Sequence, residues 1–116
     1  MNNMSYSGFM GTLRTQAALV EEVLGSQVGS YALSVEPDQL SLAARGELHF
    51  DREQARRLEA LEQVILLLQK VDGNEVIRAW AVGLAPELGD KAPLSCLRDG
   101  DVQALLLSAQ TFYANA

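Results

Sequence analysis

The chain has 116 residues, of which 48% are hydrophobic, so it is long enough for a globular core that needs no staples. Its formal net charge of −6 opposes binding to nucleic acid and favours a cationic partner. Cys96 is the single cysteine and cannot form an internal disulfide, and the longest apolar run, VILLL, is far too short for a membrane span. Because the first residues show no signal-peptide pattern, we expect a soluble cytoplasmic protein.

Apolar residues recur three or four positions apart along most of the chain, and this spacing predicts an all-α helical bundle. We expect a first helix that ends at Gly25, a second over about 26–33, and a third that begins near Pro37. The fourth helix is expected to begin after Asp51, which is a good cap with Gln54 three residues later. The apolar stripe of this helix consists of Ala55, Leu58, Leu61, Ile65 and Leu68.

A break at Val71 to Asn74 divides the sequence, and we expect one helical domain over residues 1–72 and a smaller one over 73–116. The smaller domain begins with a helix, EVIRAWAVGL, in which Trp80 is expected to be buried in the core. A compact loop rich in proline and glycine follows, with one helical turn over PLSCL. Asp99 is expected to cap the last helix.

The stretch SVEPDQLSLAARGEL, with the helix before it, has the spacing of a helix-turn-helix, in which small and apolar residues hold two short helices at a steep angle. The residues at the characteristic positions are Ser30, Val35, Leu40, Ala43 and Gly46. Two core helices with no role in nucleic-acid binding explain the same spacing equally well. The sequence therefore predicts a degenerate helix-turn-helix and leaves its role open.

Few side chains of the expected recognition helix suit DNA. Glu36 and Asp38 lie where such a helix needs lysine or arginine, and phosphate would repel both carboxylates. The candidate DNA contacts are Gln39, Leu42, Arg45, Arg52 and Arg56, with Arg57 nearby. The arginines after residue 51 also fit a solvated helix face with i,i+4 ion pairs. We therefore expect only weak binding of operator DNA by the isolated protein.

Residues suited to catalysis or metal binding are sparse. His49 and Cys96 lie in separate segments, which does not favour a nucleophile and base pair, and His49 fits better as a loop residue beside Phe50. No set of side chains has the spacing of metal ligands, and no glycine-rich phosphate loop is present. We expect no enzyme activity, no metal and no cofactor.

Several short motifs follow one another in the second half of the chain. They are carried by Trp80, Leu88, Gly89, Pro93, Leu94, Leu97, Gly100, Val102 and Leu105. A tryptophan-bearing helix, a Leu-Gly turn, a proline-led short helix and a final helix, in this order, resemble the toxin-binding domain of Xre/MbcA/ParS-type antitoxins. Members of this family also carry a helix-turn-helix with the spacing described above, so the resemblance covers the chain from about Leu19 onward.

This resemblance implies the antitoxin of a bacterial type II toxin–antitoxin pair, which binds and inhibits a RES-domain toxin that consumes NAD. Many such antitoxins also repress their own operon, and the resemblance implies a homodimer within a larger toxin–antitoxin complex. A DNA-binding transcriptional repressor, whose C-terminal half only dimerises, is the alternative. A structural scaffold without a toxin is a third interpretation.

The resemblance also places the toxin contacts in the second half. The expected contacts are Leu88, Gly89, Pro93, Leu94, Phe112, Tyr113, Ala114, Asn115 and Ala116. In the family the end of this domain can reach the NAD pocket of the toxin, and Phe112 and Tyr113 are large anchors of the kind that dominate interface energies. Alternatively, Phe112 packs on Leu105 or Leu106 and the last three residues fray.

Overall fold

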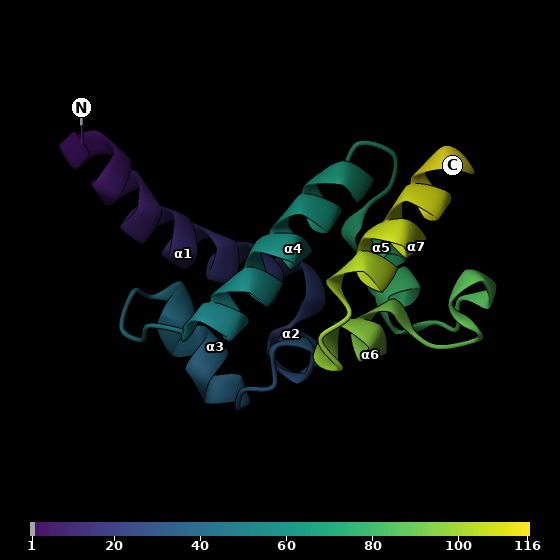
Figure 1. Cartoon of the computed structure of the whole chain (residues 1–116), viewed down its shortest axis with the longest axis horizontal. Coiled ribbons are helices and arrows are strands. Elements are labelled where there is room, and N and C mark those ends of the chain that lie inside the picture. The colour runs from purple at the N-terminus through teal and green to yellow at the C-terminus, as the bar shows by residue number, and fades with distance from the viewer. Residues whose placement is uncertain (1) are drawn as a thin grey trace.

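The computed structural model describes the backbone of residues 2–116 and the side chains of residues 13–116. Over this range the protein is all-α, as the spacing of apolar residues predicts, and no strand is present (Figure 1). The helices, in chain order, are α1 (Asn2–Leu24), α2 (Ser26–Leu33), α3 (Pro37–Ala44), α4 (Arg52–Leu68), α5 (Asn74–Val82), the short 3₁₀ helix η1 (Pro86–Leu88), α6 (Pro93–Arg98) and α7 (Val102–Ala114).

Local sequence signals set most of the helix ends. Gly25 separates α1 from α2 with a φ of 87°, a backbone conformation that favours glycine. Asp51 begins α4, where its carboxylate accepts a hydrogen bond from the Gln54 backbone N–H at 2.8 Å. Both boundaries confirm the sequence prediction.

The cap expected at Asp99 is wrong. Asp101 caps α7, because its carboxylate accepts a hydrogen bond from the Ala104 backbone N–H at 3.0 Å. Asp99 instead ends α6, and Gly100, with a φ of 91°, turns the chain between the two helices. The Asp-Gly-Asp sequence contains two candidate caps, and only the position of the turn decides between them.

The corner between α2 and α3 is closely packed. A Cβ atom at Gly29 would lie 2.8 Å from methyl carbons of both Leu40 and Val20, so this position in α2 accommodates only glycine without rearrangement. Ser30, the small residue expected here, is also buried, and its hydroxyl donates to the Gln27 carbonyl. Gly29 is therefore a second small residue at this corner.

One hydrophobic core joins the segments before and after residue 72. Leu58 and Leu61 of α4 and Leu105 of α7 are completely buried in it, and α4 and α7 lie side by side (Figure 1). A polar contact also joins the two segments: the Arg78 side chain of α5 donates a hydrogen bond to the Val23 carbonyl of α1 at 2.8 Å. The two domains expected from the sequence thus share a core.

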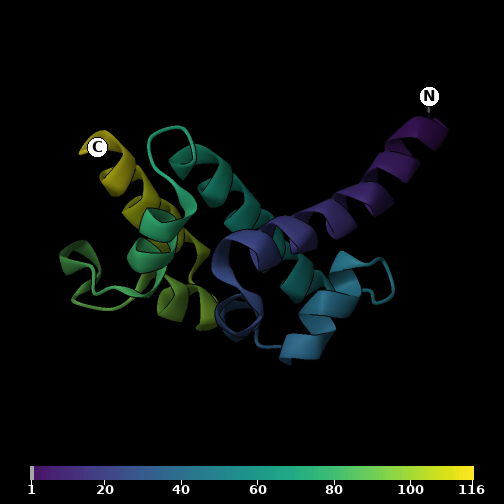
Figure 2. The same cartoon turned by 180° about the vertical axis from the view of Figure 1, so that it is seen from behind.

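The first half of α1 extends away from the other helices, as both views show (Figures 1 and 2). The rest of α1 crosses the body and contacts α3 and α4. None of the helices between residues 2 and 116 combines the length and the apolar character that crossing a bilayer requires.

Candidate functional site

A groove of about 520 Å³ lies between α5, the segment around η1 and the end of α7. Two aromatic rings line it, Trp80 from α5 and Phe112 from α7. Their centroids are 6.3 Å apart and their planes are tilted by 58°, which is a favourable arrangement for an aromatic pair. These rings join two helices that are far apart in the sequence and shape the groove.

Apolar side chains on the groove are unusually exposed. Leu84, in the loop after α5, has 72% of its surface exposed, and Val76, in the first turn of α5, has 41%. Tyr113 of α7 is exposed as well and neighbours Phe112 in the sequence. Contiguous apolar surface that remains accessible to water commonly marks a site where another protein binds.

The indole nitrogen of Trp80 has no hydrogen-bond partner. It is buried, and no acceptor among the described side chains and backbone groups lies within bonding distance. A buried donor without an acceptor costs about 1–3 kcal/mol, so this nitrogen weakens the isolated protein. Trp80 itself is only partly buried, which differs from the expected core position because the groove opens beside it.

The structure places the four expected toxin contacts before α7 in two different environments. Leu88 and Gly89 lie at η1, where Gly89 is exposed and has a φ of 70° that suits glycine. Pro93 and Leu94 begin α6 and are buried, so they hold this helix against the core. A partner protein can therefore reach the segment at Leu88 and Gly89, whereas Pro93 and Leu94 have a structural role in packing α6.

The end of the chain continues α7 and does not lie apart from the fold. Helix α7 extends through Ala114, and the Asn115 backbone N–H donates to the Thr111 carbonyl at 3.2 Å. Asn115 and Ala116 line the groove together with Phe112. Phe112 packs on Trp80, in addition to the core, and the last residues are therefore part of the same surface as the aromatic pair.

The expected DNA contacts are spread over separate elements and are partly engaged. The Gln39 side chain accepts the Glu36 backbone N–H at 2.8 Å and so belongs to the cap of α3. Leu42 is half-buried, and Arg45 lies 3.5 Å from the Glu47 carboxylate. These contacts leave few free groups on α3 for base edges.

Two arginines of α4, Arg56 and Arg57, form ion pairs with Glu53, and the Arg57 pair has the predicted i,i+4 spacing. Arg57 lies 3.0 Å and Arg56 3.4 Å from the Glu53 carboxylate, one turn away. Hydrogen bonds from Arg57 and then from Arg56 lower the pKa of the Glu53 carboxyl. Arg57 also donates to the Ser34 hydroxyl, so it braces the turn between α2 and α3.

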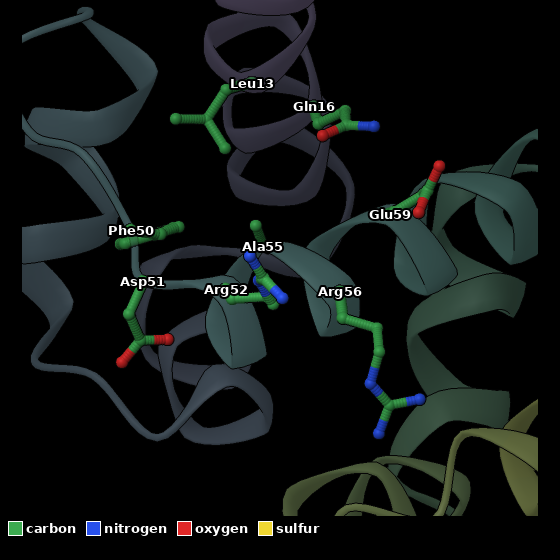
Figure 3. A pocket seen from close by; sticks show the side chains of 8 residues that line it. All are labelled: Leu13, Gln16, Phe50, Asp51, Arg52, Ala55, Arg56 and Glu59. Atoms are coloured by element: carbon green, nitrogen blue, oxygen red, sulfur yellow. The ribbon is translucent and has the colours of Figure 1, made fainter.

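A second hollow, of about 510 Å³, lies between α1 and the start of α4 (Figure 3). Arg52 and Arg56 line it, but so do the carboxylates of Asp51 and Glu59, so the charges balance. In Figure 3 the Arg56 side chain extends away from Leu13, and its guanidinium donates to the Gly100 carbonyl at 3.5 Å. This hollow lacks the net positive charge that would attract phosphate.

The described residues form neither a catalytic site nor a metal site. Cys96 is buried in α6, where burial raises the pKa of its thiol and so opposes formation of the reactive thiolate. His49 is exposed in the loop before α4, and no hydrogen bond among the described residues joins it to Cys96. No group of three or more potential metal ligands occurs among the side chains described, those of residues 13–116.

The groove is the part of the site that reasoning from sequence missed. Val76 and Leu84 carry exposed apolar surface there, although neither belongs to a motif. The sequence offered only a weak signal, a leucine in the loop between Gly83 and Pro86, because a single exposed aliphatic side chain is common on protein surfaces. Comparisons of the chain with models of protein families, with curated proteins and with solved structures found no match.

Proposed function

We propose that this protein is an antitoxin that acts by binding another protein, a RES-domain toxin that consumes NAD. The observation that carries the proposal is the groove, which the exposed apolar side chains of Val76 and Leu84 line together with the Trp80–Phe112 pair. The similarity of the second half to Xre/MbcA/ParS-type antitoxins gives the partner its identity. A binding partner completes such a surface by covering Val76 and Leu84.

The end of α7 takes part in this proposal as the inhibitory element. Tyr113 is exposed beside the groove, and Ala114, Asn115 and Ala116 are small residues that fit a narrow cleft. Since α7 is helical through Ala114, the element is presented as a rigid helix end, which lowers the entropy cost of docking. The toxin's NAD pocket is the cleft that this end enters in our proposal.

Co-purification with a RES-domain toxin tests the proposal. Val76→Asp places a charge on the groove, and Leu107→Asp places the same charge on an exposed part of α7 that does not line the groove. We expect Val76→Asp to lose the toxin and Leu107→Asp to retain it. Equal retention by both variants would move the binding site away from the groove.

A further inference from the structure

Glu87 is the only charged side chain among the described residues that line the groove. The other lining side chains are apolar, apart from Thr111 and Asn115, which are polar and neutral. Glu87 is exposed, and the segment that carries it lies at one edge of the molecule in both views (Figures 1 and 2). A partner that fills the groove therefore meets one carboxylate within an otherwise uncharged surface.

Two sets of hydrogen bonds hold Glu87 in place in the free protein. In the backbone, the Ala85 N–H donates to the Lys91 carbonyl at 3.0 Å and the Asp90 N–H donates to the Ala85 carbonyl at 2.9 Å, which closes the segment around η1. In the side chain, Oε2 of Glu87 accepts a hydrogen bond of 2.8 Å from the hydroxyl of Ser108, a completely buried residue of α7. Because the carboxylate is positioned before binding, a contact with it costs little conformational entropy.

No cation of the protein neutralises this carboxylate. None of the ion pairs among the described side chains involves Glu87. Asp90 and Lys91 are adjacent and opposite in charge, and Glu75 of α5 is balanced by Arg78, whose guanidinium is engaged at a backbone carbonyl of α1. The charge of Glu87 is therefore left without a partner, in a chain whose net charge is −6.

We propose that Glu87 determines the specificity of the groove by forming an ion pair with a lysine or arginine of the toxin surface that fills it. This inference rests on the proposed function, because it names a contact of the same site. The apolar side chains of Val76 and Leu84 supply the area that is buried, and the fixed carboxylate selects a surface that carries a cation among apolar residues. A surface with a carboxylate at this place would be repelled.

Titration calorimetry of the full chain with a RES-domain toxin, at low and at high salt, tests the proposal. Glu87→Gln removes the charge and keeps an acceptor oxygen for Ser108, so it should retain the wild-type circular dichroism. Its affinity for the toxin should be about tenfold lower at low salt, because a charge-assisted contact is lost. Its affinity should also change less with salt concentration than that of the wild-type protein.

Asp90→Asn is the matched control, because it removes the same charge from the same segment at a position that does not line the groove. Asp90 has a φ of 61°, a conformation that asparagine tolerates. This variant should bind the toxin within about twofold of the wild-type affinity, as expected for an exposed charge outside the contact.

Ser108→Ala distinguishes the charge of Glu87 from a role in shaping the segment. It deletes the buried hydroxyl but keeps the charge, so it should weaken binding less than Glu87→Gln does. Greater weakening by Ser108→Ala than by Glu87→Gln, equal weakening by Asp90→Asn and Glu87→Gln, or a wild-type salt dependence of Glu87→Gln would overturn this inference and leave toxin binding intact. A wild-type protein that binds no RES-domain toxin would instead refute the proposed function, and this inference with it.

Discussion

The Trp80 indole nitrogen has no hydrogen-bond partner, and this changes the expected effect of substitutions at Trp80 on the free energy of unfolding. Trp80→Ala and Trp80→Phe test the effect. Replacing a buried aromatic residue with alanine costs about 3–5 kcal/mol, and the partial exposure of Trp80 beside the groove places it at the lower end, about 3 kcal/mol. Removing a buried donor that has no acceptor returns about 1 kcal/mol. Trp80→Ala should therefore lower the free energy of unfolding by about 2 kcal/mol.

Trp80→Phe is the matched variant, because it keeps a ring against Phe112 and removes the N–H group. The lost ring area and the removed donor act in opposite directions, so the free energy of unfolding should change by less than about 1 kcal/mol. Urea unfolding followed by circular dichroism measures both variants, since Trp80 is the only tryptophan and fluorescence would be lost. A loss above about 2 kcal/mol for Trp80→Phe would show that the indole N–H is hydrogen-bonded in solution and would refute the reasoning.

Three further predictions concern the fold and DNA. Gly29→Ala should destabilise the protein by about 1–3 kcal/mol in thermal or urea unfolding, because the added Cβ meets Leu40 and Val20; an unchanged stability would mean that the corner has free space. Asp101→Ala should cost about 1 kcal/mol through loss of the α7 cap, whereas Asp99→Ala should cost much less, and the reverse order would restore the cap expected from sequence. Gel-shift titration with the upstream DNA should show weak binding at physiological salt, and tight sequence-specific binding would favour the repressor alternative.

The sequence predicted the helices well because their signals are local. The apolar stripe of α4 and the Asp51 cap are set by residues within one or two turns of each other, and both are present. Asp99 failed as a cap because the chain turns at Gly100, and the aspartate after this turn, Asp101, is the one that reaches the first free N–H groups of α7. The position of this turn depends on how α6 docks on the rest of the protein.

The groove could not be predicted in the same way, because it exists only where α5 meets α7. Trp80 and Phe112 are 32 positions apart in the sequence, and their contact follows from the packing of both helices on the common core. The exposure of Trp80 has the same origin, since helical spacing identifies an apolar face but not where the neighbouring helix ends. Arg57 is an intermediate case. The i,i+4 spacing predicts its ion pair with Glu53, but its hydrogen bond to the Ser34 hydroxyl depends on the tertiary fold and could not be predicted.

Inhibition of the toxin is the most direct test of the central claim, that this protein acts by binding another protein through the groove. NAD consumption by the purified RES-domain toxin should fall to zero as the wild-type protein is titrated to saturation. The Leu107→Asp protein should give the same curve, and the Val76→Asp protein should leave NAD consumption unchanged at equal concentration. Full inhibition by Val76→Asp, or no inhibition by the wild-type protein, would contradict the account.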